Sequence, residues 1–222
     1  WAKRVPSPTA CASRRSSERF QPLRSFALGQ CRAPNRRALA ERTARTVAWA
    51  TASAAMVAST IDPDGSVSSR TVLLKGLDDS GLEFVTNYTS RKGKALLHNP
   101  SISLLFPWYG LKRQVIVYGE AKPTVAEVSD LYWNRRPKGA QLASAASDQS
   151  APIASREELD KQLAALEAKF PGDTVVPRPE HWGGFRVIPH AFEFWQGRSM
   201  RFHDRVRYEL VGSHWQKTRL QP

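Results

Sequence analysis

Short segments in which apolar and polar residues alternate begin near residue 54 and are separated by clusters of Asp, Gly, Pro and Ser. This period of two predicts β-strands, which we expect at 54–61, 67–75, 82–86, 102–108 and 114–122. The first two separators, Asp62-Pro63-Asp64-Gly65 and Asp78-Asp79-Ser80-Gly81, are typical of tight turns. Strands joined by such short turns indicate an antiparallel sheet or barrel rather than a doubly wound parallel sheet.

Helical patterns interrupt and follow these strands, beginning with a short helix predicted at 90–98. Thr124 with Glu127, and Ser155 with Glu158, have the spacing of a capping box. Helices are therefore predicted at 125–135 and from the second box to residue 170. Further strands are expected at 185–188, 191–195, 206–210 and 214–220. The whole pattern predicts a mainly β fold with peripheral helices (α+β).

Composition places the chain among ordinary globular proteins. It has 222 residues, 41% of them hydrophobic, which is enough for one domain with a buried core. No apolar run reaches the roughly 18 residues of a membrane-spanning helix, so we expect none. Cys11 and Cys31 are the two cysteines, and no His or Cys cluster has metal-ligand spacing. We expect no disulfide framework, no metal site and a cytoplasmic location.

The formal net charge of +13 is concentrated near the N-terminus, where residues 1–50 contain eleven Lys and Arg but two acidic residues. This Arg-, Ala- and Ser-rich composition predicts a disordered arm over residues 1–53. An organellar transit peptide has a similar Arg- and Ser-rich, acid-poor composition, and it would direct the protein to an organelle instead of the cytoplasm. A nucleic-acid-binding arm is a further alternative, but the charge pattern supports weak, salt-sensitive binding at best.

Basic residues at strand ends and turns are the first candidates for a binding site. Arg70 and Lys75 are five residues apart on a predicted strand, so they should point to opposite faces. Arg91 and Lys92 begin the helix predicted at 90–98. A helix N-terminus with two cations suits a phosphate, and a solvated basic turn is the alternative.

Tyr132 and Arg136 form a second candidate near a predicted helix end. They are four residues apart and should share a helix face, where a hydroxyl and a guanidinium could clamp a phosphate. Ordinary cations at a helix C-terminus are the simpler interpretation of this segment taken alone.

The segment after residue 194 is the third candidate. Arg201, His203 and Arg205 alternate along a predicted extended stretch and could line one face, while Trp195 could stack on a flat heterocycle. A polar outer strand face with a core Trp is the alternative. No nucleophile elbow, Walker loop or Rossmann fingerprint occurs, so we expect the chemistry to belong to a bound cofactor.

Taken in order, these segments resemble the pyridoxamine 5′-phosphate oxidase family over residues 54–222. The matching motifs are Arg70 to Lys75, Thr86-Asn87 with Ser90-Arg91-Lys92, Leu105-Phe106-Pro107-Trp108, Arg113-Gln114-Val115, Arg136-Pro137, Gln149-Ser150, Trp182-Gly183-Gly184-Phe185-Arg186, Glu193-Phe194-Trp195-Gln196-Gly197, Arg201-x-His203-Asp204-Arg205 and Arg219-Leu220-x-Pro222. Many short motifs in one order are far more specific than any one of them.

The resemblance implies a homodimeric split β-barrel that binds flavin mononucleotide (FMN) between subunits. It implies flavin contacts from Arg70, Thr71, Val72, Leu73, Leu74, Lys75, Val85, Thr86, Arg91, Lys92, Gln114, Gln149, Ser150, Trp195 and Arg205. Lys75, Tyr132 and Arg136 would hold the substrate phosphate, and Arg201 and His203 would lie against the pyridine ring as catalytic residues. The implied reaction moves a hydride from substrate C4′ to flavin N5, giving pyridoxal 5′-phosphate, and O2 then reoxidises the flavin to give H2O2.

The same resemblance predicts an FMN-binding split-barrel domain over 54–170 and a C-terminal dimerisation and substrate-site region over 180–222. Three departures stand out: Ala140 replaces a common phosphate-binding Ser, 143–145 lacks an aromatic, and 1–53 carries no family motif. Two other functions therefore remain open. One is a related flavin oxidase of another heterocycle, as in phenazine biosynthesis, and the other is a non-catalytic FMN- or pyridoxal-phosphate-binding protein.

Overall fold

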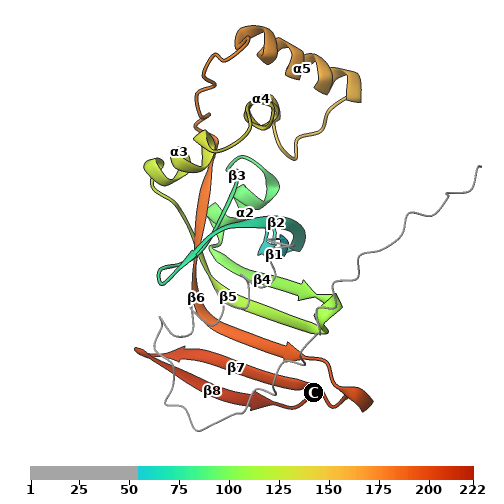
Figure 1. Cartoon of the computed structure of the whole chain (residues 1–222), viewed down its shortest axis with the longest axis vertical. Coiled ribbons are helices and arrows are strands. Elements are labelled where there is room, and N and C mark those ends of the chain that lie inside the picture. The colour runs from blue at the N-terminus through green and yellow to red at the C-terminus, as the bar shows by residue number, and fades with distance from the viewer. Residues whose placement is uncertain (1–54) are drawn as a thin grey trace, which may run out of the picture. The chain divides into compact units, whose positions relative to one another are not determined.

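The structure is a computed structural model that describes residues 55–222 (Figure 1). The predicted N-terminal arm (1–53), the first residue of the first predicted strand and both cysteines lie outside the described residues. Within the described residues, no helix combines the length and apolar character needed to span a membrane. The same residues contain no group of three or more His, Cys, Asp or Glu placed to hold a metal ion.

Six antiparallel strands close into a barrel. They are β1 (Ala55–Ile61), β2 (Val67–Asp78), β3 (Gly81–Asn87), β4 (Ser101–Trp108), β5 (Arg113–Pro123) and β6 (Trp182–Gln196). They pair in the order β3-β2-β1-β4-β5-β6, and β6 also pairs with β3. The antiparallel barrel predicted from alternating residues and short turns is therefore confirmed.

The alternating pattern fills the barrel with apolar side chains. Along β4, Ile102, Leu104, Phe106 and Trp108 are buried while the residues between them are more exposed. Phe84 and other inward residues of neighbouring strands complete one continuous core. Burial of each large apolar side chain contributes roughly 1.5–3 kcal/mol, so this shared core is what keeps the strand register fixed.

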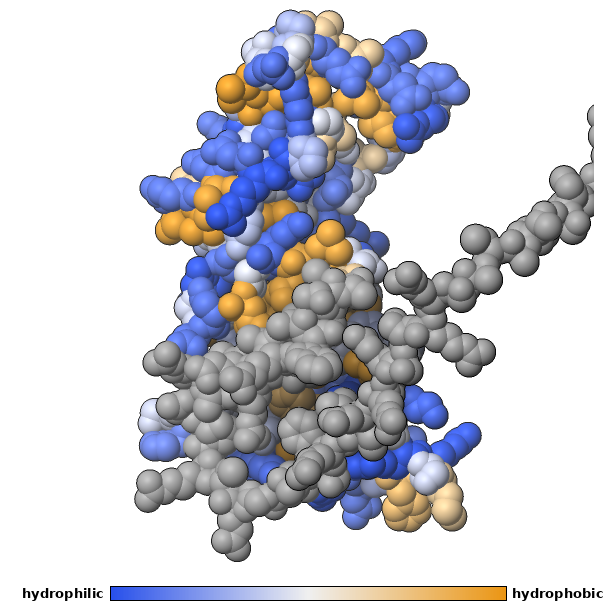
Figure 2. Space-filling model, viewed as in Figure 1, coloured by the Kyte–Doolittle hydropathy of each residue, from blue (hydrophilic) through white to orange (hydrophobic). Residues whose placement is uncertain are grey.

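Between residues 55 and 222, four α-helices and two short 3₁₀ turns connect the strands. The helices are α2 (Arg91–His98), α3 (Ala126–Asn134), α4 (Lys138–Ala146) and α5 (Arg156–Lys169), and the turns are η1 (Tyr109–Leu111) and η2 (Ser199–Arg201). Leu163, Leu166 and Phe170 pack α5 against a second apolar cluster that includes Trp133 and Trp182. Figure 2 shows hydrophilic side chains along the outer side of α5 and hydrophobic ones toward α4.

The helix starts confirm one predicted cap and contradict the other. Ser155 caps α5 by accepting a hydrogen bond from the Glu158 N–H at 3.3 Å. The Thr124 and Glu127 capping box is wrong, because Val125 is the N-cap residue of α3 and makes no side-chain cap. The Thr124 hydroxyl instead pairs with the Ser129 hydroxyl at 2.9 Å. Helix α4 was not predicted, although Pro137 at its N-cap and its Ala-rich sequence favour a helix.

β6 belongs to both the barrel and a second part of the sheet. Its first residues pair with β3, and its last residues pair with β7 (Asp204–Val211), which pairs with β8 (His214–Leu220). The partner changes around Pro189, where the register with β5 shifts between Tyr118 and Gly119. The two strands predicted at 185–188 and 191–195 are therefore one strand. Pro189 has no N–H to donate to the hydrogen bonds between the strands, and the bulge accommodates it there.

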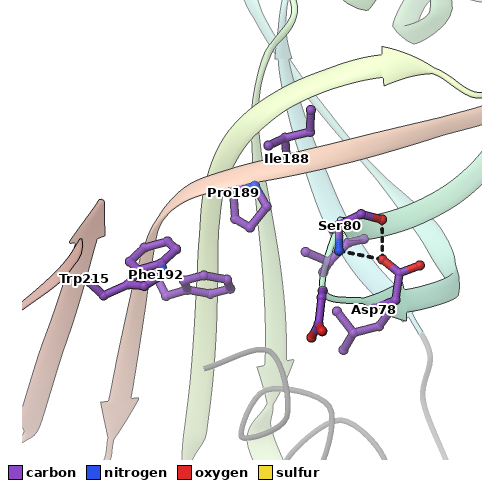
Figure 3. A pocket seen from close by; sticks show the side chains of 10 residues that line it. Asp78, Ser80, Ile188, Pro189, Phe192 and Trp215 are labelled. Carbon is purple, nitrogen blue, oxygen red and sulfur yellow. Dashed lines mark hydrogen bonds between the residues drawn. The ribbon is translucent and has the colours of Figure 1, made fainter. Parts of the chain in front are cut away.

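A small cavity lies where β6 leaves the barrel (Figure 3). Ile188, Pro189, Phe192 and Trp215 line it from β6 and β8, and the β2–β3 turn that contains Asp78 lines it from the barrel. Its volume is about 30 Å³, which leaves room for a water molecule or two but not for a flavin ring. None of the predicted site residues lines it.

The close approach of β5 to the bulge requires a glycine. A Cβ on Gly119 would lie 2.5 Å from the main-chain oxygen of Ile188, whereas a Cβ on Gly110 would meet no atom within 4 Å. We predict that Gly119→Ala lowers the free energy of unfolding by about 1–3 kcal/mol, while the matched Gly110→Ala changes it little. Urea denaturation of both variants checks this, and equal stability of the two would contradict the described bulge.

Candidate functional site

Five predicted site residues gather between β2 and α2. Lys92 Nζ donates to Gln149 Oε1 at 2.6 Å and to Thr86 Oγ1 at 3.0 Å, which joins α2, the loop after α4 and β3. Arg70 lies close enough for its charge to act on Lys92. Arg91 immediately precedes Lys92 and is the first residue of α2. We call Arg70, Thr86, Arg91, Lys92 and Gln149 the β2–α2 cluster. It presents cationic and hydroxyl donors from separate segments, as an anion site requires.

Burial and mutual repulsion weaken the charges in this cluster. Burial, and then the nearby charge of Arg70, lower the pKa of Lys92 to about 8. Burial also lowers the pKa of Arg70, whose guanidinium donates to Thr60 Oγ1 at 2.8 Å and to the Ser68 hydroxyl. These partners are neutral, so among the described residues neither cation is hydrogen-bonded to an acid, although the nearby charge of Asp62 partly offsets the effect of burial on Arg70.

Arg91 differs from its neighbours because it has an acidic partner. Its Nε and Nη2 contact Asp62 Oδ2 at 2.7 and 2.6 Å, and Asp62 lies in the turn between β1 and β2. Burial alone would raise the pKa of Asp62, but hydrogen bonds from Arg91, Ser68 and Ser66 outweigh it and lower that pKa. Arg91 is therefore held at the start of α2 by an ion pair rather than left as a solvated basic turn.

A second set of predicted residues forms a row across β5, β6 and β7. Gln114 is paired with Trp195, and Trp195 with Arg205, so the three occupy neighbouring positions on adjacent strands. Arg205 Nε and Nη2 donate to Glu193 Oε1 at 2.9 and 2.8 Å, and Glu193 is buried. The imidazole of His203 lies beside the Trp195 indole, with ring centroids 4.8 Å apart. We call Gln114, Trp195, His203 and Arg205 the β5–β7 row.

The predicted alternation of Arg201, His203 and Arg205 along one strand is wrong. β7 begins at Asp204, and the preceding turn has Met200 at φ 56° and Arg201 at φ 61°. Such left-handed backbone is uncommon for residues with a side chain and reverses the chain here. Arg201 is exposed in η2, while His203 Nδ1 accepts from the Arg198 N–H at 3.1 Å.

Tyr132 and Arg136 lie near each other in sequence but have separate partners. The Tyr132 hydroxyl donates to Glu83 Oε2 at 2.6 Å. Arg136 lies beyond the end of α3, so the expected shared helix face is wrong. Its Nη2 donates to Ser144 Oγ at 2.9 Å, and its guanidinium lies 5.1 Å from the Trp182 ring centroid. Within residues 55–222 the buried Nε of Arg136 has no hydrogen-bond partner.

The predicted contacts along β2 divide between the two faces of the strand. Val72 is buried and Leu74 packs against the barrel core, so they can offer only main-chain atoms to a ligand. Thr71, Leu73 and Lys75 are exposed on the opposite face. Arg70 is half-buried on the face of Val72, so Arg70 and Lys75 point to opposite sides as their spacing predicts.

Of the remaining predicted residues, Val85 is half-buried against the second apolar cluster, and Ser150 has a left-handed φ of 77° beside Gln149. A cavity of about 490 Å³ opens beside the β5–β7 row, lined by Gln114, Trp195, His203 and neighbouring residues. Among the described residues, no hydrogen bond or ion pair connects this row, the β2–α2 cluster and the Tyr132 and Arg136 region.

Comparison with known sequences identifies the family. A family model described as Pyridoxamine 5′-phosphate oxidase matches residues 43–170. Another, described as Pyridoxine 5′-phosphate oxidase C-terminal dimerisation region, matches residues 182–222. The chain belongs to the pyridoxamine 5′-phosphate oxidase family.

Individual members of this family support the assignment. The chain is 54% identical over 174 residues to the pyridoxine/pyridoxamine 5′-phosphate oxidase of Thermobifida fusca, covering 76% of this chain and 79% of the relative. It is 53% identical over 168 residues to that of Rubrobacter xylanophilus, with 76% and 77% covered.

A solved structure, PhzG of Burkholderia lata in complex with tetrahydrophenazine-1-carboxylic acid, is similar with a TM-score of 0.76 at 35% identity. The similarity covers 83% of this chain and 91% of PhzG.

Position 140, where the resemblance leads us to expect a phosphate-binding Ser, is Ala, and the structure shows a hydroxyl one helical turn later. Ser144 and the main-chain oxygen of Ala140 both accept from Arg136 Nη2, at 2.9 and 3.3 Å. Ser144 thus orients Arg136 from α4, although it cannot be equated with the missing phosphate ligand.

Sequence reasoning missed three acidic residues that hold predicted site residues. Asp62 binds Arg91, Glu83 binds Tyr132, and Glu193 binds Arg205. Glu193 belongs to one of the matching family motifs, but no role was assigned to any of the three. The available signal was an acid inside an apolar strand, since Glu83 follows Leu82 and precedes Phe84, and Glu193 lies between Phe192 and Phe194. Such buried acids need partners, and here the partners are the site residues.

Proposed function

We propose that this chain is an FMN-dependent oxidase that converts pyridoxine or pyridoxamine 5′-phosphate to pyridoxal 5′-phosphate as a homodimer. O2 is the electron acceptor and H2O2 the product. The observation that carries the proposal is the β2–α2 cluster, in which cations from separate segments lie together and neither Arg70 nor Lys92 is hydrogen-bonded to an acid among the described residues. The membership of the oxidase family supports the same substrate class.

The residues of the described chain fit FMN. A phosphate dianion at the β2–α2 cluster would offset the repulsion between Lys92 and Arg70, and it would raise the pKa of Lys92. At the β5–β7 row, the Trp195 indole offers a flat surface and Gln114 an amide to a polar planar ring. When bound, FMN supplies a hydride acceptor.

A homodimer explains how separate groups can form one site. The matched dimerisation region, 182–222, contains three members of the β5–β7 row, whereas the β2–α2 cluster lies in the other matched region. Leu73, Tyr109 and Phe202 are 50%, 85% and 77% exposed, which suits surfaces that a second copy covers. We infer that the cluster of one protomer faces the row of its partner.

In this proposal the chain's own residues bind and orient the substrate. Lys75, Tyr132 and Arg136 hold the phosphate ester, and Arg201 and His203 contact the pyridine ring. His203 Nδ1 already accepts from the main chain, so a neutral ring carries its hydrogen on Nε2 and can donate from there. Orientation of two rings at hydride distance supplies much of the rate, so no strong general base is needed.

The similarity to PhzG favours one alternative, an oxidase of a phenazine precursor. A third possibility is a protein that binds FMN without turnover.

The purified chain should be yellow, and addition of pyridoxine 5′-phosphate should consume O2 and release H2O2. Bound flavin with no peroxide from either phosphorylated vitamer would contradict the proposed reaction, and turnover of a tricyclic carboxylate instead would favour the PhzG-like activity.

Arg201 and Arg91 should affect different ligands. Arg201→Ala removes a charged contact to the substrate ring, so we expect turnover to fall about 10- to 100-fold while FMN affinity changes little. Arg91→Ala should instead weaken FMN binding. Steady-state kinetics and flavin titration check both variants, and equal loss of turnover and flavin affinity in Arg201→Ala would show that its assigned ligand is wrong.

FMN affinity should depend on the protonation of Lys92, whose pKa is about 8 without ligand. The ammonium form binds the phosphate, so affinity is full below pH 8 and is lost as the pH rises through this value. We expect the Kd of FMN to rise about tenfold between pH 7 and 9. Lys92→Arg keeps its charge over this range and should flatten the profile, measured by flavin titration. A flat profile in the unsubstituted protein would place Lys92 outside the phosphate site.

A further inference from the structure

Glu83 is a buried carboxylate in the middle of β3, with 6% of its surface exposed. Its Oε1 accepts a hydrogen bond from Arg186 Nη2, so an ion pair compensates for the burial of its charge. Its Oε2 accepts the Tyr132 hydroxyl at 2.6 Å. The carboxylate is therefore fully engaged by one cation and one phenol, and it reaches a residue that the proposed function places at the substrate phosphate.

The position of this pair along β2 depends on Gly76. A Cβ on Gly76 would lie 2.6 Å from the Tyr132 hydroxyl oxygen and 2.9 Å from Glu83 Oε2. The phenol and the carboxylate thus rest directly on the main chain next to Lys75. Since Lys75 is, like Tyr132, an expected phosphate ligand, Glu83 and the phosphate ester would approach the same hydroxyl.

A phenol has a single hydrogen to donate. Burial and the bond to Glu83 raise the pKa of Tyr132 to about 12, so the hydroxyl keeps that hydrogen at neutral pH. A carboxylate and a phosphate dianion are both acceptors, so Tyr132 cannot donate to both at once. Binding of the phosphate ester through Tyr132 therefore requires that the bond to Glu83 be given up.

We propose that Glu83 is a specificity-determining residue that competes with the substrate phosphate for the Tyr132 hydroxyl and so lowers the affinity for phosphate esters. This inference rests on the proposed function, which places Tyr132 at the phosphate. Ester binding then replaces the hydrogen bond from Tyr132 to Glu83 with one from Tyr132 to the phosphate. Only the difference in free energy between these two bonds contributes to affinity. The turnover of bound substrate does not depend on Glu83.

Two substitutions at position 83 separate hydrogen bonding from charge. Glu83→Gln leaves a weaker, neutral acceptor, whereas Glu83→Asp keeps the charge beside Arg186 but shortens its reach to Tyr132. We expect both to lower the KM for pyridoxine 5′-phosphate about three- to tenfold with kcat within twofold. The inhibition constant of inorganic phosphate and the Kd of pyridoxal 5′-phosphate, titrated on the FMN-loaded protein, should fall by a similar factor.

The matched control is Glu209→Gln, which removes a carboxylate paired with Arg207 at 2.8 Å on β7 and should leave these constants unchanged. Tyr132→Phe removes the contested hydroxyl, and in that background neither Glu83 variant should alter KM. Thermal melting of each variant shows whether it is folded. If either Glu83 variant fails to fold, the other carries the comparison with Tyr132→Phe.

If substitution of Glu83 raises KM for the phosphate ester or leaves it unchanged, the proposed competition is wrong. It is also wrong if the Glu83 substitutions still lower KM in the protein that carries Tyr132→Phe. A fall in Glu83→Gln with none in Glu83→Asp would assign the effect to charge and would also overturn it. Failure of the proposed function gives a different result, because Tyr132→Phe alone would then leave KM for the phosphate ester unchanged.

Discussion

Arg70 and Lys92 lie close enough for one charge to lower the pKa of the other, and both are partly buried. Holding two such cations together costs stability, and within the described residues their hydrogen-bond partners are neutral oxygens. An anion bound beside them would offset their mutual repulsion. We therefore propose that the phosphate group of the flavin binds where β2, β3 and α2 meet.

β6 determines where the second half of the site lies. Its first residues close the barrel against β3, and after the bulge at Pro189 its last residues join β7 and carry Trp195 away from the barrel core. Buried acids then fix the individual site residues: Glu193 holds Arg205, and Glu83 holds Tyr132. The chain thus presents two separate surfaces, and our proposed homodimer would bring them together.

The barrel could be predicted from sequence because alternation and turn residues act locally. The cap at Ser155 is equally local, whereas the Thr124 hydroxyl pairs with the Ser129 hydroxyl and does not cap its helix. The reversal at Arg201 could not be predicted, because Met and Arg are not among the residue types that favour a left-handed φ. Site roles came from family motifs, which do not say which residues pair with one another. Glu193 stands inside a motif, yet its pairing with Arg205 depends on strand register that a linear sequence does not show.

The central claim is that one site combines the β2–α2 cluster of one protomer with the β5–β7 row of its partner. Mixed dimers of Lys92→Ala and Arg205→Ala chains test it most directly, because each parent dimer lacks one half of every site. If the halves come from different protomers, random mixing restores one intact site in half of the dimers, and about a quarter of unsubstituted activity should return. Mixed dimers as inactive as both parents would show that each site is built within one chain and would contradict the account.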